Sequence, residues 1–391
     1  MALQPAAGAR DRNPWEVDQN RRLRTLLADV YRLWGYQEVD PPTIERLDTL
    51  EAGGAIAGRE VVRLAADEPL GLRPELTASI ARAASTRLAG RPRPLRLWAD
   101  GSTFRSSIGE GGDQRLNESI QSGVELLGEP SAGADRELME LLLAATATLG
   151  LRPEHQPTLL VGHHGLLDAL LERLPDAVRL AARRALTEFD PLALSELDLA
   201  SAQRDELQAL LNLRGDPAGV LSTLEQWIGA SEVLTSLASI LNAVAPAARR
   251  HGVRLQLDPT FQPHFDLYDG LVLKLVCRGA DAPVAIASGG RYDGLVRRFS
   301  SGGSGTAGTG FGFAIEAVRD LLAQDPPPAE PSAPWLVVSA QGDLEAVLAR
   351  MAEFHGRGEA AELHAHPCRD EAEAAELARR RGCRGAVWVA G

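Results

Sequence analysis

Cysteine, lysine and long hydrophobic runs are what this sequence of 391 residues has little of. Its three cysteines, Cys277, Cys368 and Cys383, are odd in number and show no C-x-x-C spacing, which favours reduced thiols over a disulfide framework. No apolar run approaches the roughly 18–20 residues of a membrane helix, and the N-terminus lacks the apolar region of a secretory signal. We therefore expect a cytoplasmic protein with no membrane association.

The charge balance argues against a nucleic-acid partner. Lys274 is the only lysine, all other basic residues are arginine, and the formal net charge is −12. The eight histidines show no metal-ligand spacing, so we predict neither a metal site nor a cofactor. With 45% hydrophobic and 24% charged residues, the chain has ample material for a globular core.

The N-terminal third shows a helix and then strands. Asn13, Pro14 and Glu16 have the pattern of an N-cap, a first-turn proline and a capping-box acid, and Gly35 ends the helix. Residues 1–12 before it look loosely tied. The following segment GYQEVDPPTIE (35–45) fits an edge strand or a dimer interface, and we expect a homodimer through residues 35–50.

The next segments predict a hairpin and a polar turn. Residues 95–105 and 115–128 alternate as antiparallel strands around a loop at 106–114, which places Gln121, Gly123 and Glu125 on one face. A turn with Glu75 and Thr77 leads into a helix. Polar side chains on an inward face need partners, so this face is a candidate ligand site.

The second half predicts an insertion, a glycine turn and a separate C-terminal unit. Between strands at 158–162 and 253–258, residues 165–250 show only helical patterns. A strand at 284–288 meets Gly289-Gly290, read as a turn that places Tyr292 and Asp293 at the strand exit. We thus expect a main domain (1–325), a proline-rich linker (326–334) and a βαβαβ unit (335–391).

Several segments, in this order, resemble the class II histidyl-tRNA synthetase family over nearly the whole chain. GYQEVDPPTIE resembles its first motif, LRPELTA (72–78) its LRPEGTA segment, and STFR with QSGVELLG its second motif. SGGRYDGLV (288–296) resembles the second histidine-recognition segment and GFGFAIEAVR (310–319) the third motif. The resemblance implies an α+β fold, an antiparallel sheet flanked by helices, with a helical insertion and a small C-terminal α/β domain that matches a truncated anticodon-binding domain.

The resemblance also implies a site for free histidine. By motif match its residues are Glu75, Thr77, Arg105, Gln121, Glu125, Tyr268 and Tyr292. Acids and an amide suit an ammonium group and an imidazole N–H, an arginine suits a carboxylate, and two tyrosines can flank the ring.

The residues for catalysis depart from the family pattern. Pro263 stands where the first histidine segment has an arginine, and a proline offers no cation to a reacting phosphate. We matched Arg319 to the third motif's arginine, which puts Glu316 at a glycine and Val318 at the motif's glutamate. Asn117 stands at a further arginine of the second motif. We therefore predict no catalytic residues and no tRNA partner.

A histidine site beside a broken nucleotide site resembles the regulatory-subunit family of ATP phosphoribosyltransferase. This implies a non-catalytic subunit, built on a homodimer, that assembles with the short-form catalytic subunit, as a hetero-octamer, for the first step of L-histidine biosynthesis and its feedback inhibition. The alternatives are an active histidyl-tRNA synthetase or another histidine-activating paralogue, and a vestigial scaffold. The sequence leaves open whether histidine binds this pocket or a subunit interface.

Overall fold

A computed structural model of the protein describes residues 5–52, 58–109, 112–262, 267–300, 306–323 and 333–389. They form two compact units, residues 1–324 and 325–391, and most of the predicted linker lies outside the described residues. None of the described helices is long and apolar enough to cross a membrane.

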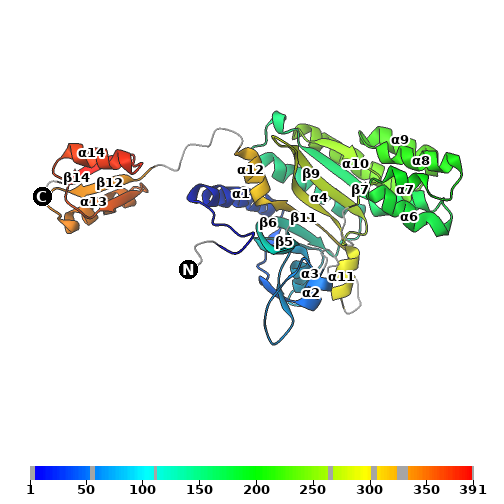
Figure 1. The fold of residues 1–391 in the computed structure, drawn as a ribbon, viewed down its shortest axis with the longest axis horizontal. Helices are drawn as coiled ribbons and strands as arrows, with labels where there is room; N and C mark the ends of the chain where they lie inside the picture. The colour runs from blue at the N-terminus through cyan, green and yellow to red at the C-terminus, as the bar shows by residue number, and fades with distance from the viewer. Residues whose placement is uncertain are drawn as a thin grey trace. The chain divides into compact units, whose positions relative to one another are not determined.

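The main unit is built on an eight-stranded sheet (Figure 1). Its strands, in spatial order, are β1 (Gln37–Glu38), β5 (Leu95–Ile108), β6 (Gln114–Leu127), β11 (Gly308–Ala314), β10 (Pro283–Arg291), β9 (Leu271–Arg278), β7 (Thr158–His163) and β8 (Arg254–Leu257). Neighbours from β5 to β7 are antiparallel, and the two outer pairs, β1/β5 and β7/β8, are parallel. The predicted α+β class is confirmed, and the predicted edge strand is β1.

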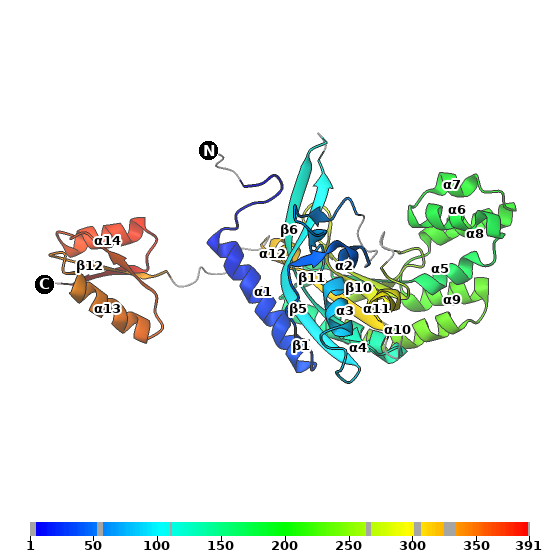
Figure 2. The ribbon, with the colours of Figure 1, turned by 90° about the horizontal axis from the view of Figure 1, so that it is seen from below.

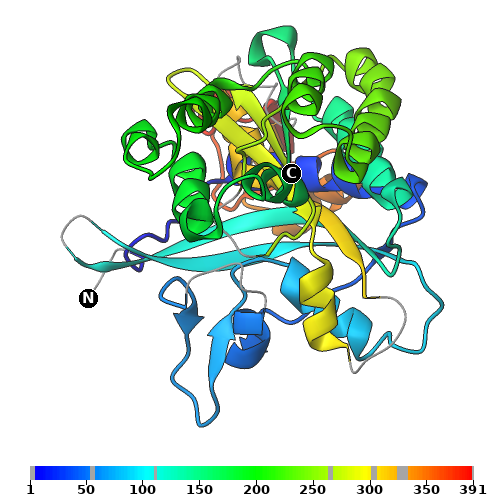
Figure 3. The same cartoon turned by 90° about the vertical axis from the view of Figure 1, so that its right-hand side faces the viewer.

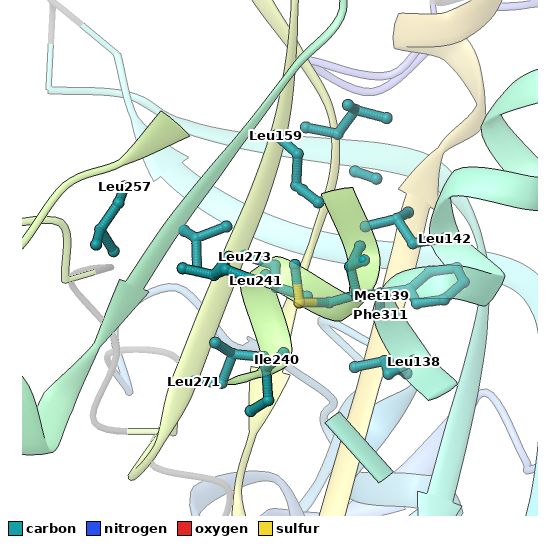
Figure 4. Close-up of a cluster of buried hydrophobic side chains, with 14 of the residues drawn as sticks. Leu138, Met139, Leu142, Leu159, Ile240, Leu241, Leu257, Leu271, Leu273 and Phe311 are labelled. Carbon is teal, nitrogen blue, oxygen red and sulfur yellow. The ribbon is translucent and has the colours of Figure 1, made fainter. Parts of the chain in front are cut away.

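Helices cover one face of this sheet and enclose the larger core. They are α1 (Pro14–Leu33), α4 (Ala132–Thr148), α10 (Glu232–Arg250) and α12 (Ile315–Leu322). Figure 4 shows leucines of β7 and β9 beside Leu138, Met139 and Leu142 of α4 and Ile240 of α10, with Leu257 of β8 at the edge of the same cluster. The apolar side chains of α1 and α4 recur at helical spacing, and burying that stripe against the sheet drives the packing.

The predicted helix start of α1 is confirmed. The Asn13 side chain accepts a hydrogen bond from the Glu16 N–H, and the Glu16 carboxylate accepts one from the Asn13 N–H. Gly35 follows the helix with a φ of 80°, a backbone conformation that glycine adopts without strain.

A second, smaller core lies on the opposite face at the β5–β6 end. It contains side chains of α2 (Leu47–Ala52), α3 (Thr77–Ser85) and α11 (Asp293–Phe299), packed on Leu97 and Leu127 of the hairpin. Figure 3 shows α11 and the short N-terminal helices on one side of the long hairpin, with the insertion on the other. A three-stranded sheet of β2 (Ile44–Arg46), β4 (Leu70–Leu72) and β3 (Val62–Arg63) adjoins them.

The helical insertion occupies the predicted place between two strands of one sheet. After η1 (Pro153–His155) and β7 come α5 (His164–Leu171), α6 (Asp176–Thr187), α7 (Pro191–Ser195), α8 (Ser201–Asn212) and α9 (Pro217–Ile228), then α10 and β8. Helices α6 to α9 gather beyond the β7 side of the sheet (Figures 1 and 2).

The C-terminal unit is a parallel three-stranded sheet with helices on both faces. Its elements are β12 (Trp335–Ser339), α13 (Leu344–Gly356), β13 (Ala361–His364), α14 (Glu371–Arg380) and β14 (Gly385–Val389), and β12 is central. Leu336 and Val338 face α14, whereas Val337 faces α13. This alternation is what a strand buried on both faces requires.

Three local expectations were wrong. Gly289 and Gly290 are not in a turn but inside β10, paired with both β9 and β11. Residues 5–12 are held to the main unit, because the Leu116 N–H donates to the Ala7 carbonyl and Arg12 pairs with Glu316. The hairpin strands extend further into the loop than predicted, to Ile108 and from Gln114.

Candidate ligand-binding site

The start of helix α3 positions the first group of predicted site residues. The Glu75 carboxylate accepts hydrogen bonds from the N–H groups of Thr77 and Ala78, so it caps the helix it precedes. The Gln121 side-chain oxygen accepts the Leu76 N–H at 3.1 Å, and Arg105 Nε donates to the Pro74 carbonyl at 3.3 Å. These two side chains of the hairpin β5–β6 therefore fix the position of the turn by hydrogen bonds to its backbone.

Glycines in the neighbouring strands make room for the polar side chains. A Cβ at Gly310 would overlap the Glu125 carboxylate, and one at Gly312 would overlap the Gln121 amide. A Cβ at Gly290 would collide with the Tyr268 ring, 2.8 Å from its Cδ1. These glycines are needed because polar and aromatic side chains of neighbouring segments pack directly against the backbone here, and not because the chain turns.

The side chains surround a cavity of about 110 Å³ on the sheet face that carries α3. One water needs about 10–15 Å³, so the cavity has room for several waters or one small molecule. Its lining residues are Glu75, Thr77, Arg105, Gln121, Phe261, Leu267, Tyr268, Leu273, Lys274, Ser288, Tyr292, Gly310, Phe311 and Gly312. Six of the seven predicted residues are among them.

The seventh, Glu125, lies behind the cavity wall. Its carboxyl group accepts a hydrogen bond from the Tyr292 hydroxyl, and both side chains are almost fully buried. Asp293, which the sequence also placed near a pocket, turns away. It pairs with Arg291 and accepts the Gly308 N–H at 3.0 Å.

Burial governs the ionisation of the site. It raises the pKa of Glu125 to about 8, because hydrogen bonds from Thr77 and Tyr292 offset the lost hydration only in part. Burial likewise raises the pKa of Glu75, and the hydrogen bonds from the N–H groups of α3, which lower it, offset this effect only in part. The pKa values of Tyr268 and Tyr292 are also raised by burial, so both hydroxyls stay protonated. The site thus offers hydrogen-bond donors and acceptors on side chains that are largely shielded from water.

Sequence reasoning missed Lys274, Phe261 and Ser288. Lys274 Nζ lies 5.3 Å from the centroid of the Phe261 ring. The sequence could have indicated Lys274, because it is the only lysine of the chain and stands in the predicted strand just before the segment that contains Ser288. In the described part of the chain, no cluster of three or more His, Cys, Asp or Glu side chains could hold a metal ion.

A second cavity, of about 330 Å³, contains Asn117 and Glu316, two of the positions where catalysis was predicted to be lost. It is lined by Asn117, Glu118, Ser119, Ala314, Glu316, Ala317, Asp320 and the N-terminal residues Gly8, Ala9, Arg10 and Arg12. Glu316 accepts the Ile120 N–H at 2.8 Å and pairs with Arg12 at 3.0 Å. Its carboxylate is therefore already bound within the protein.

Arg319 does not reach this cavity. The residue is 2% exposed, and its guanidinium group contacts Asp320 beside it and Glu16 and Asn20 of α1. Our alignment of Arg319 with the arginine of the third motif was therefore out of register. Glu316-Ala317, which do line the cavity, fit the motif's Glu-Arg pair better, and the arginine is then replaced by alanine. Pro263 lies outside the described residues.

A wider groove, of about 470 Å³, lies at the β7–β8–β9 end of the sheet, near Arg254, Arg278 and Asp281. These charged side chains are exposed, so the groove lacks the buried acids of the smaller cavity. Cavity size alone therefore does not locate the candidate site; the buried polar groups do.

The fold and the motifs define a histidyl-tRNA synthetase-like protein. A model of the family described as "Histidyl-tRNA synthetase" matches residues 8–318. A crystal structure of histidyl-tRNA synthetase from Nostoc sp. PCC 7120 superposes with a TM-score of 0.79 at 17% identity, covering 100% of this chain and 92% of that one, and shows the fold alone.

Full-length relatives give the narrower family. The "ATP phosphoribosyltransferase regulatory subunit" of Synechococcus sp. (strain RCC307) is 51% identical and that of Prochlorococcus marinus (strain MIT 9303) 49%, each over 100% of both chains. An "ATP phosphoribosyltransferase regulatory subunit/histidyl-tRNA synthetase" from Bacillus halodurans C superposes with a TM-score of 0.83 at 25% identity, covering 100% and 99% of the two chains. The chain belongs to the family of ATP phosphoribosyltransferase regulatory subunits.

Proposed function

We propose that the main unit binds free L-histidine in the 110 Å³ cavity and that binding regulates a partner enzyme. The observation that carries this proposal is that six of the seven predicted side chains, from separate segments, line one cavity of small-molecule size, with Glu125 bonded to Tyr292 behind its wall. Glu75 and Gln121 suit the ammonium group, and Tyr268 and Tyr292 can flank the imidazole ring, with Glu125 behind them. Such a mixed set of buried acids and donors favours a zwitterionic ligand that satisfies them.

We infer that the chain itself is not catalytic. An aminoacyl-tRNA synthetase must neutralise charge on a reacting phosphate, and cations at the nucleotide site supply that stabilisation. Here Asn117 and Ala317 line the second cavity without charge, and Arg12 is paired with Glu316 and Glu118. The sequence has Pro263 where the family has a further arginine.

In this proposal the partner is the short-form catalytic subunit of ATP phosphoribosyltransferase, assembled with this chain as a hetero-octamer around homodimers in the cytoplasm. The complex joins ATP to phosphoribosyl pyrophosphate and releases pyrophosphate, in the first step of L-histidine biosynthesis. Feedback requires histidine to bind the less active arrangement more tightly, by about 1–3 kcal/mol in typical allostery.

The test measures phosphoribosyltransferase activity of the catalytic subunit alone, with this chain added, and with histidine titrated in. We expect activation by the chain and inhibition by histidine. Tyr292→Phe, which removes the hydroxyl bonded to Glu125, should keep the activation and weaken the response to histidine. Tyr31→Phe is the matched control, because Tyr31 is also buried and its hydroxyl donates to the Ser122 carbonyl at 3.4 Å, but it does not line the cavity. If histidine at millimolar concentration neither binds nor inhibits, the feedback half of the proposal is refuted.

An active histidyl-tRNA synthetase is the second candidate, favoured by the intact set of histidine-type residues. Histidine-dependent pyrophosphate exchange with ATP by this chain alone would establish it and overturn the non-catalytic proposal. A vestigial scaffold predicts instead that Glu75→Ala and Tyr292→Ala change neither activation nor inhibition.

A further inference from the structure

Lys274 places a cation in the cavity that the sequence motifs did not indicate. It lies on β9, where it pairs with Ser288 of β10, and Ser288 pairs with Gly312 of β11. Paired residues of neighbouring strands point to the same face of a sheet. Lys274, Ser288 and Gly312 therefore form one row across the cavity floor.

This row gives the cavity two chemically different ends. Gln121 lies over Gly312, beside the α3 turn that carries Glu75. Lys274 is two strands away from Gly312, a separation of about 10 Å at the usual strand spacing. The acids and the amide thus occupy one end, and the ammonium group of Lys274 with the Ser288 hydroxyl occupies the other.

The charge of Lys274 is not neutralised by its described neighbours. Within the described ranges its one assigned contact is the face of the Phe261 ring, and it has no ion pair with Asp or Glu. Arg105, the other cation of the cavity, is by contrast engaged with the Pro74 carbonyl and lies near Glu75. Many arginines elsewhere in this acidic chain are ion-paired. An ammonium group at the end of the cavity away from Glu75, with no acid beside it among the described residues, therefore indicates an anionic group as its ligand.

We propose that Lys274, assisted by the Ser288 hydroxyl, binds the carboxylate of the amino-acid ligand and makes the site selective for a free α-carboxylate. The assignment rests on the proposed function, because it takes a free amino acid as the ligand of the cavity. It orients the ligand with its ammonium group toward Glu75 and its carboxylate toward β9. A site of this kind rejects esters, amides and alcohols that lack the negative charge.

The test is isothermal titration calorimetry of the full chain, alone and with the catalytic subunit, using L-histidine and L-histidinol. Histidinol keeps the amine and the imidazole but has a hydroxymethyl group in place of the carboxylate. We expect wild type to bind histidinol at least about tenfold more weakly. Lys274→Met should weaken histidine binding by about tenfold or more and leave histidinol binding within about twofold. Lys274→Arg should retain the preference for histidine.

Arg278→Met is the matched control, since Arg278 lies four residues further along β9, is exposed and does not line the cavity. Thermal unfolding of each variant checks that the fold is retained. If wild type and Lys274→Met bind histidine equally, the assignment of Lys274 is overturned while the histidine site stands. If wild type binds no histidine at millimolar concentration, the proposed function fails and the assignment fails with it.

The single lysine offers a second readout that needs no activity. Reductive ¹³C-methylation labels only Lys274 and the N-terminal amine, so the Lys274 dimethylammonium signal can be followed by NMR. Histidine should shift this signal, since a bound carboxylate places a negative charge beside the dimethylammonium group. Histidinol should leave it unchanged, and an equal response to both ligands would contradict the carboxylate contact.

Discussion

Replacing Glu125 with glutamine should remove a pH dependence from the stability of the protein. Burial raises the pKa of Glu125 from an ordinary 4.5 to about 8. Between these values the folded protein binds a proton that the unfolded chain releases, so stability is lost as pH rises from about 4.5 to 8. A difference of about 3.5 units at 1.36 kcal/mol per unit sets an upper limit of about 5 kcal/mol. The amide of Glu125→Gln keeps a neutral, hydrogen-bonding group at every pH.

The assay is urea unfolding of wild type and Glu125→Gln at about pH 5.5, 7 and 8.5. The stability of the variant relative to wild type should rise with pH, by about 3 kcal/mol between pH 5.5 and 8.5 at the upper limit. Comparison with wild type cancels the titration of Glu75, which is present in both proteins. Glu118→Gln, on the same strand but with a carboxylate 36% exposed, should show no such trend. A stability difference that is constant from pH 5.5 to 8.5 would refute the reasoning and mean that Glu125 is ionised in the folded protein.

Two further predictions concern the support of the site. Arg291→Ala should cost about 3–5 kcal/mol in urea unfolding, because it leaves the buried Asp135 carboxylate without the guanidinium 2.9 Å away; a loss as small as that of the exposed Arg184→Ala, under about 1 kcal/mol, would contradict it. Gly289→Ala should destabilise the sheet by about 1–3 kcal/mol, since its Cβ would overlap the Gly310 carbonyl. Gly219→Ala in α9, where the Cβ meets nothing within 4 Å, should instead stabilise by about 0.5–1 kcal/mol. Equal melting temperatures for the two glycine variants would count against the steric argument.

The elements that the sequence predicted well depend on local interactions. The capping box of Asn13 and Glu16 joins groups three residues apart, and the hairpin β5–β6 follows from a period-two pattern around one loop. The helical insertion was visible because it changes the period of the apolar residues from two to 3.6. Six of the seven predicted site residues also line the cavity. They were identified by the resemblance of their short motifs to those of a known family.

The sequence by itself therefore determined the class of fold, the order of its elements and the candidate residues of the site, because these are encoded in short-range patterns. Only the tertiary structure decided which side chains meet across strands far apart in the chain. It placed Lys274 in the cavity, Glu125 behind Tyr292, and Arg319 against α1 rather than at the second cavity. It also showed that Gly290 and Gly310 lie inside strands. Such outcomes depend on sheet register and burial, which set the charge and the accessibility of a side chain and which no local pattern specifies.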